Sequence, residues 1–174
     1  MRRLMLLRHA KSDWPVGVAD LERPLAPRGR AEAPVIGSFM AREALRPHLA
    51  LVSPAKRTRE TWALVSAALA EPPPHKIDAA LYMATAEALI ARVRATDAGV
   101  QTLLLLGHNP GLEDLARTLA GTGDAAAKKR LTASFPTSGL AVIDFPSDHW
   151  TDVQEQAGTL VLYATPQSLG ARRA

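Results

Sequence analysis

The chain has 174 residues, of which 47% are hydrophobic and 5% aromatic, a length typical of one domain with one hydrophobic core. The 21 Lys and Arg residues against 17 Asp and Glu give a net charge of +4, which describes a mildly basic globular protein and excludes a highly charged disordered chain. The sequence contains no cysteine, which excludes disulfide scaffolds, cysteine-ligated zinc, iron–sulfur clusters and thiol nucleophiles.

The apolar segments are too short for a signal peptide or a membrane-spanning helix, because the runs at 4–7 and 103–106 have four residues each. We therefore expect a cytoplasmic protein without a membrane partner. The basic residues are spread along the chain, with short clusters only at 56–59 and 128–130. Basicity without a concentrated patch does not favour nucleic acid, so we expect no nucleic-acid partner.

Apolar runs and helical patterns alternate along the chain. In chain order, they predict a strand at 4–7, a helix at 28–45, a strand at 49–52, helices at 55–69 and 85–96, a strand at 102–106, a helix start at 109–111, and strands at 140–145 and 160–163. Strands that alternate with helices are typical of a three-layer α/β/α sandwich with a mostly parallel central sheet. We expect residues 1–174 to form a single domain of this α/β class.

Two polar segments are predicted to lie outside these helices and strands. Residues 13–27 contain three prolines and a glycine and predict a surface loop, so that 11–27 is the segment available as a lid. The last two predicted strands flank a turn-rich segment at 146–158, which predicts an antiparallel addition at the sheet edge.

Three of the predicted strands are followed directly by residues whose side chains can bind a ligand or take part in catalysis. Arg8 and His9 follow the first strand, Ser53 follows the second with Arg57 close behind, and His108 follows a third. Ligands of open parallel sheets bind beyond the carboxyl ends of the strands, so we expect these side chains to share one crevice. A lone histidine at a strand end is more often structural, but two histidines with two arginines favour a functional site.

This combination of residues suits a phosphoryl anion. A guanidinium group binds phosphate through paired hydrogen bonds and keeps its charge, while imidazole can act as a nucleophile, acid or base near neutral pH. We expect Ser53 to cap the following helix and Pro54 to occupy its first position, which places Arg57 in the first turn. The free N–H groups and the helix dipole also favour an anion there.

Several short motifs occur in order along the chain. The first set is Leu7-Arg8-His9-Ala10, Ser53-Pro54 with Arg57 and Thr61, and Gly107-His108-Asn109. A second set is Arg8-His9-Ala10-Lys11-Ser12, Arg23-Pro24-Leu25 with Gly29, and Leu81-Tyr82. Through the first set the sequence resembles the histidine phosphatase superfamily, also called phosphoglycerate mutase-like. Through both sets it resembles, more narrowly, the short SixA-type phosphohistidine phosphatases. The resemblance extends from residue 1 to about residue 139.

The resemblance implies a metal-independent phosphatase with a phosphohistidine intermediate on the enzyme. His9 would attack phosphorus, while Arg8, Arg57 and His108 would bind the phosphoryl oxygens and stabilise their charge in the transition state. No cofactor is expected, and no His-x-His or His-Glu-x-x-His spacing suggests a metal site. Three residues adjoin the matched positions and are candidates for substrate binding: Lys11, Ser12 and Asn109.

Two positions depart from the family pattern. Ala10 stands where many members have glycine, which restricts the backbone beside the phosphate. Mutase-like members place a glutamate as general acid near 79–83, but the carboxylates closest in sequence here are Asp78 and Glu87, with Glu113 as a third candidate. A phosphate ester needs its leaving oxygen protonated, whereas an N-phosphorylated imidazole can leave as neutral imidazole. The sequence therefore favours phosphohistidine, carried on a partner protein, as the substrate.

Two other functions stay open. One is a broad-specificity phosphomonoesterase that acts on small phosphorylated metabolites. The other is a non-catalytic module that binds phosphate or another polyanion. A panel of substrates separates the two enzymes, and substitution of His9 separates both from the binding module.

Overall fold

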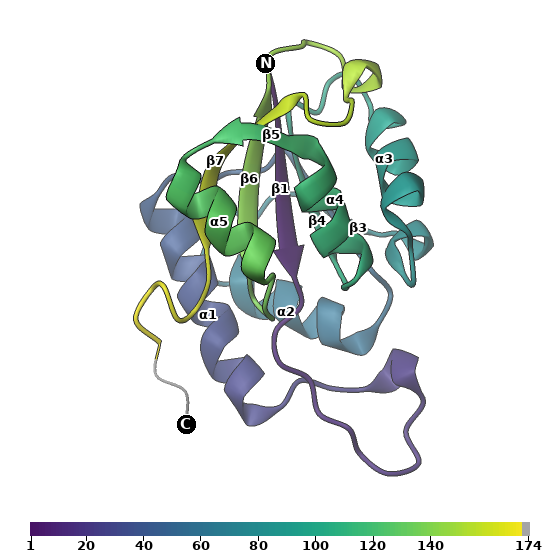
Figure 1. Ribbon diagram of the computed structural model, residues 1–174. Helices are drawn as coiled ribbons and strands as arrows, with labels where there is room; N and C mark the ends of the chain where they lie inside the picture. The colour runs from purple at the N-terminus through teal and green to yellow at the C-terminus, as the bar shows by residue number, and fades with distance from the viewer. Residues whose placement is uncertain (172–174) are drawn as a thin grey trace.

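Seven strands form one mixed sheet in the computed structural model, which describes residues 1–171 (Figure 1). The strands are β1 (Arg2–Arg8), β2 (Leu49–Val52), β3 (His75–Ile77), β4 (Thr102–Gly107), β5 (Ala120–Gly123), β6 (Leu140–Phe145) and β7 (Gly158–Ala164). Their order across the sheet is β3-β2-β4-β1-β6-β7-β5. The pairs β3–β2, β2–β4 and β4–β1 are parallel. Strand β6 runs antiparallel to both of its neighbours, and β5 pairs in parallel with β7.

Helices cover both faces of the sheet (Figure 1). They are α1 (Pro27–Arg42), α2 (Lys56–Ser66), α3 (Ala86–Arg94), α4 (Gly111–Leu119) and α5 (Ala125–Ala133). Met5 and Leu7 of β1 pack in one core with α1 and α2, while Leu4 and Leu6 pack in a second core with α3, α4 and α5. Because β1 is buried on both faces, it reads as a continuous apolar run. Within residues 1–171, no helix combines the length and the hydropathy that crossing a membrane requires.

The architecture confirms the predicted three-layer α/β/α sandwich, but three of its elements have no signal in the sequence. Strand β3 has three residues, all exposed, and β5 is the tetrapeptide Ala-Gly-Thr-Gly, which has no apolar alternation. Helix α5 buries only Leu131. These elements form because tertiary contacts hold them in place, which local patterns do not report.

The predicted antiparallel addition forms, because β6 and β7 pair antiparallel, but neither strand is the outermost strand of the sheet. The strand that runs against the others is β6, which lies inside the sheet between β1 and β7, and the edge is the unpredicted β5. Close approach of the backbone explains why this edge is rich in glycine. A Cβ atom at Gly121 would lie 1.9 Å from the carbonyl oxygen of Gln156, so no larger residue fits there without a shift of the chain.

Candidate active site

The carboxyl ends of three neighbouring strands meet at one edge of the sheet, as the sequence predicts. Backbone hydrogen bonds continue past the strands, from His9 N–H to the Gly107 carbonyl (3.1 Å) and from Ser53 N–H to the Leu106 carbonyl (3.1 Å). The rings of His9, after β1, and His108, after β4, have centroids 5.3 Å apart. The two histidines therefore share one site.

The His9 ring is buried and has one free nitrogen. Its Nδ1 lies 2.7 Å from the Ala10 carbonyl oxygen, and because a carbonyl only accepts, Nδ1 carries the proton and donates it. This leaves the lone pair on Nε2. Burial lowers the pKa of the His9 ring to about 3, helped by the charges of His108, Arg8 and Arg57, so the ring is neutral at physiological pH. A neutral imidazole with a fixed tautomer is a competent nucleophile.

Both arginines are anchored through their terminal nitrogens. Arg8 Nη1 donates to the Phe135 carbonyl (3.1 Å), and Arg57 Nη1 donates to the Asp20 carbonyl (2.7 Å). The Nε–H of each arginine is buried and has no hydrogen-bond partner within residues 1–171. A buried donor without a partner is costly, and an anion bound between the two arginines would satisfy both. Each guanidinium group therefore keeps one donor that residues 1–171 leave unpaired.

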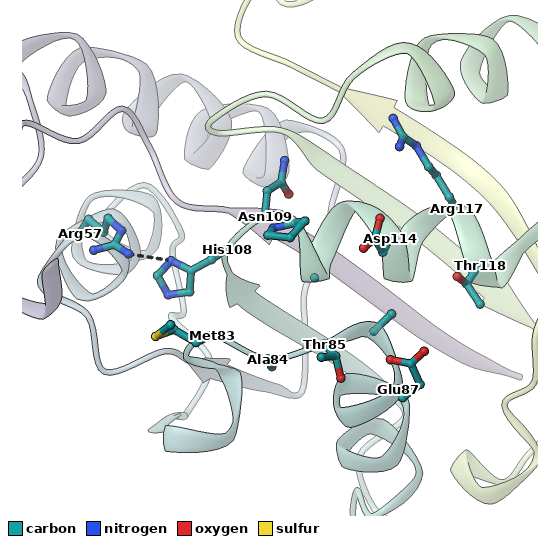
Figure 2. Close-up of a pocket in the computed structure, with 13 residues that line it drawn as sticks. Arg57, Met83, Ala84, Thr85, Glu87, His108, Asn109, Asp114, Arg117 and Thr118 are labelled. Carbon is teal, nitrogen blue, oxygen red and sulfur yellow. Dashed lines mark hydrogen bonds between the residues drawn. The ribbon is translucent and has the colours of Figure 1, made fainter.

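The His108 ring is held at both nitrogens. Arg57 Nη2 lies 3.3 Å from Nδ1 (dashed in Figure 2), and since a guanidinium only donates, Nδ1 accepts. The proton is therefore on Nε2, which donates to the hydroxyl oxygen of Ser53 at 2.7 Å. Burial, followed by the charge of Arg57, lowers the pKa of His108 to about 4.

The contact with His108 corrects the predicted role of Ser53. Helix α2 begins at Lys56 with Ala55 at the N-cap position, so Ser53 is not the cap and Pro54 is not the first helical residue. The chain makes an additional bend between the strand and the helix, which frees the Ser53 hydroxyl for the histidine. Arg57 nevertheless lies in the first turn of α2, as predicted.

Thr61 fixes the backbone beside His9. Its hydroxyl oxygen accepts a hydrogen bond from Ala10 N–H (3.0 Å) and donates to the carbonyl of Arg57 (2.7 Å), one turn earlier in α2. Ala10 is fully buried, and its φ is not in the left-handed region that favours glycine. The alanine at this position therefore imposes no backbone strain.

Asp20 is the site residue that the sequence does not reveal. It lies in the loop between β1 and α1, where its Oδ2 accepts from Arg57 Nη2 (3.1 Å) and from the Tyr82 hydroxyl, and its Oδ1 accepts from Arg23 Nη1 (3.0 Å). These hydrogen bonds, with that of Tyr82 the largest, hold the pKa of Asp20 well below its usual range. Arg23 and Tyr82 belong to the SixA-type pattern, but no local feature of the loop singles out Asp20 between them.

The three weaker candidates occupy different environments. Lys11 is exposed. Ser12 is buried, and its hydroxyl accepts from Arg23 Nη2 (2.6 Å), so it secures the loop instead of opening onto the strand ends. Asn109 lines a cavity beside His108, and its Nδ2 donates to the Phe135 carbonyl (2.8 Å), which also binds Arg8.

That cavity leads away from the strand ends and has a volume of about 690 Å³. Arg57 and His108 lie at one end, and Figure 2 shows Thr85 and Glu87 on one wall with Asp114 and Arg117 along the other. Its size and mixed lining suit a small molecule or a side chain with its neighbouring groups.

Two of the three carboxylates named as candidate general acids are paired with arginines. Asp78 is paired with Arg92 (2.6 Å), and Glu113 is paired with Arg117 (2.9 Å). Glu87, which belongs to α3, lines the same cavity as His108. The carboxylate that does reach Arg57 is Asp20, and it is ionised.

Comparisons with known proteins agree with this geometry. Residues 4–82 match the histidine phosphatase superfamily (branch 1). An uncharacterized protein of Mycobacterium tuberculosis is 37% identical over 163 residues, which cover 92% of this chain and all of that protein. A structure from Agrobacterium tumefaciens, described as a candidate phosphohistidine phosphatase SixA, is 32% identical with a TM-score of 0.80 over 95% of this chain and 98% of that one.

The protein histidine phosphatase SixA complexed with tungstate shares the fold, with a TM-score of 0.77 at 21% identity over 96% of this chain and 99% of that one. The family match begins in β1 and includes both arginines and the first histidine of the site. Together with relatives that align over nearly its whole length, these matches place the chain in the histidine phosphatase superfamily.

Proposed function

We propose that this protein is a metal-independent phosphatase that uses His9 as its nucleophile and hydrolyses phosphohistidine on a partner protein. The observation that carries the proposal is the state of the His9 ring, which is neutral, with its Nδ1 proton held by the Ala10 carbonyl and its Nε2 free. Arg8 and Arg57 supply unpartnered donors beside it for the phosphoryl oxygens.

The reaction has two steps. In the first, Nε2 of His9 attacks phosphorus and the P–N bond of the substrate breaks, with its electron pair passing to the substrate ring, which leaves as neutral imidazole. In the second, water attacks the phosphoryl group on His9, the bond to Nε2 breaks with its electron pair returning to the ring, and the water proton leaves with phosphate. Nδ1 keeps its proton throughout, bound to the Ala10 carbonyl.

The charge state of Asp20 supports phosphohistidine as the substrate. The carboxylate bound to Arg57 is Asp20, whose pKa lies well below its usual range, so it has no proton to give to an ester oxygen. A phosphorylated imidazole that carries a proton on its other nitrogen needs no such donor.

Exposed apolar residues support a substrate carried on a protein. Trp14 is 72% exposed and Val16 is fully exposed, both in the loop that carries Asp20, and Met83 is 81% exposed beside the cavity. Exposed apolar groups beside a site are suited to contact with a protein partner. A small metabolite, the second candidate substrate, is favoured only by the volume of the cavity.

The test compares rates on a histidine-phosphorylated protein and on a chromogenic phosphate ester. We expect the parent to have a higher kcat/KM on phosphohistidine than on the ester. We expect His9→Ala to lose activity on both substrates by about a thousandfold or more. His149→Ala, which alters an exposed histidine outside the site, is the control. Faster hydrolysis of the ester would favour the metabolite phosphatase, and a parent inactive on both would favour the binding module.

A further inference from the structure

We propose that Asp20 selects the leaving group, because its carboxylate binds the protonated imidazole of phosphohistidine and repels leaving groups that carry negative charge. This inference rests on the proposed phosphatase function and adds a specificity determinant to it. It concerns a residue that lies in the loop between β1 and α1, at a distance in sequence from the strand ends.

The carboxylate is fixed in place from two directions. Arg57 binds it from α2, through Nη2 to Oδ2 at 3.1 Å, and Arg23 binds it from its own loop, through Nη1 to Oδ1 at 3.0 Å. Tyr82 adds a third donor to Oδ2. A short side chain held by three donors has little freedom to move, so its charge stays at one position relative to Arg57.

The hydrogen bonds to the Asp20 carboxylate leave one acceptor site for a ligand. Each carboxylate oxygen accepts about two hydrogen bonds. Oδ2 is filled by Arg57 and Tyr82, whereas within residues 1–171 Oδ1 accepts only from Arg23, which leaves one site on Oδ1 without a donor from that part of the chain. The Asp20 side chain is 46% exposed, so a substrate can reach it.

The position of this charge relates it to the leaving group. Arg57 bridges Asp20 and His108, since its Nη2 lies within hydrogen-bond distance of both, while its buried Nε–H has no partner within residues 1–171. Asp20 thus lies against the terminal nitrogens of a guanidinium group that the proposed mechanism uses to bind the phosphoryl group. The part of the substrate that extends from phosphorus over Arg57 comes under the influence of the carboxylate.

The chemistry of phosphohistidine matches such a group. Its ring departs easily only when the nitrogen away from phosphorus carries a proton, which makes the ring cationic before the P–N bond breaks. That N–H can donate to Oδ1 of Asp20, and the bond pair then moves to the ring nitrogen that leaves phosphorus. The proton stays on the ring, so Asp20 stabilises the cationic ring without exchanging a proton. A leaving group that bears a carboxylate meets repulsion at the same place.

The experiment compares three small substrates that differ in the leaving group: phosphoimidazole, phenyl phosphate and 4-carboxyphenyl phosphate. Asp20→Asn keeps the shape of the side chain and removes the charge. We expect kcat/KM for phosphoimidazole to fall about tenfold, as for loss of a hydrogen bond to a charged group, and the ratio of carboxyphenyl to phenyl phosphate to rise severalfold. Asp20→Glu should retain the preference of the parent.

The matched control is Asp13→Asn, which makes the same charge change in the same loop. The Asp13 carboxylate accepts from the N–H of Trp14 and does not contact Arg57. We expect this variant to keep the parent ratios, and thermal unfolding should show that all variants are folded.

Two results would overturn the inference, and they differ from each other. If Asp20→Asn changes all three substrates by one common factor, Asp20 only orients Arg57 and does not select the leaving group, although the phosphatase function stands. If the folded parent hydrolyses none of the three substrates and no histidine-phosphorylated protein, the proposed function itself fails and the inference fails with it.

Discussion

The Ser53 hydroxyl lies 2.7 Å from Nε2 of His108, so a residue at the end of β2 fixes the ring of a histidine at the end of β4. With Arg57 on Nδ1, this contact sets both the tautomer and the orientation of the ring. The strand order makes the pair possible, because β2 and β4 are hydrogen-bonded neighbours.

We predict that Ser53→Ala lowers kcat/KM about tenfold and leaves the fold intact, because His108 loses one of the two partners that orient it. Steady-state kinetics and circular dichroism check this. Ser66→Ala, at the end of α2, serves as the control and should behave like the parent. Equal activity of Ser53→Ala and the parent would show that the hydroxyl does not position the ring.

A covalent intermediate on His9 should be detectable by its acid lability. Stopping the parent during turnover of a labelled substrate with alkali should retain phosphate on the protein, whereas stopping it with acid should release the phosphate, because a phosphorus–nitrogen bond hydrolyses in acid. Mass spectrometry of the alkali-treated protein locates the site. His9→Ala should retain none. Equal retention in acid and alkali would indicate another kind of intermediate.

The stability of the protein should fall as the pH decreases from 6.5 towards 5. The unfolded chain takes up a proton on His9 near pH 6.5, whereas the folded protein does not until about pH 3. The stability from this group is therefore complete above pH 6.5 and is lost below it, by about 1.4 kcal/mol per pH unit. His108, with its pKa lowered to about 4, acts in the same direction.

Urea unfolding at pH 7.5, 6 and 5 measures this dependence. His9→Asn removes one of the two groups, so its free energy of unfolding should depend less on pH than that of the parent. His149→Asn, on the exposed segment before η3 (Trp150–Asp152), should leave the dependence unchanged. A His9→Asn variant as sensitive to pH as the parent would mean that the ring is not buried in its neutral form.

The loop between β1 and α1 should contribute to recognition of a protein substrate. Trp14→Ala combined with Val16→Ser removes two exposed apolar groups, which should raise KM for a histidine-phosphorylated protein severalfold and leave kcat/KM for phosphoimidazole close to that of the parent. Val161→Ser on β7 removes an exposed apolar group elsewhere. Equal effects on the large and the small substrate would argue against docking through this loop.

The sequence predicts the parts of the fold that carry their own signal. β1 and β4 are buried on both faces, so each appears as an uninterrupted apolar run, and the residues that follow them lie together because parallel strands end at the same edge. Strand β5 has no such signal, since two of its four residues are glycines in close contact with neighbouring backbone.

The same contrast holds within the site. Arg8, His9, Arg57 and His108 follow predicted strands closely, so topology alone brings them together. Asp20 lies 37 positions from Arg57 in the sequence. It contacts Arg57 from a loop whose path depends on tertiary contacts, which local sequence patterns do not report. The sequence does not distinguish the two roles of Ser53, because one additional bend before α2 decides whether its hydroxyl caps the helix or binds a histidine.

One backbone atom shows how the site depends on the second half of the chain. The Phe135 carbonyl, just beyond α5, accepts hydrogen bonds from Arg8 and from Asn109, and the Phe135 ring stacks on Tyr163 of β7. The segment that matches the family, residues 4–82, holds both arginines but not this carbonyl. A fragment that ends before Phe135 would therefore keep Arg8 and Arg57 but lose the contact that orients Arg8, so the two arginines do not form a transplantable unit.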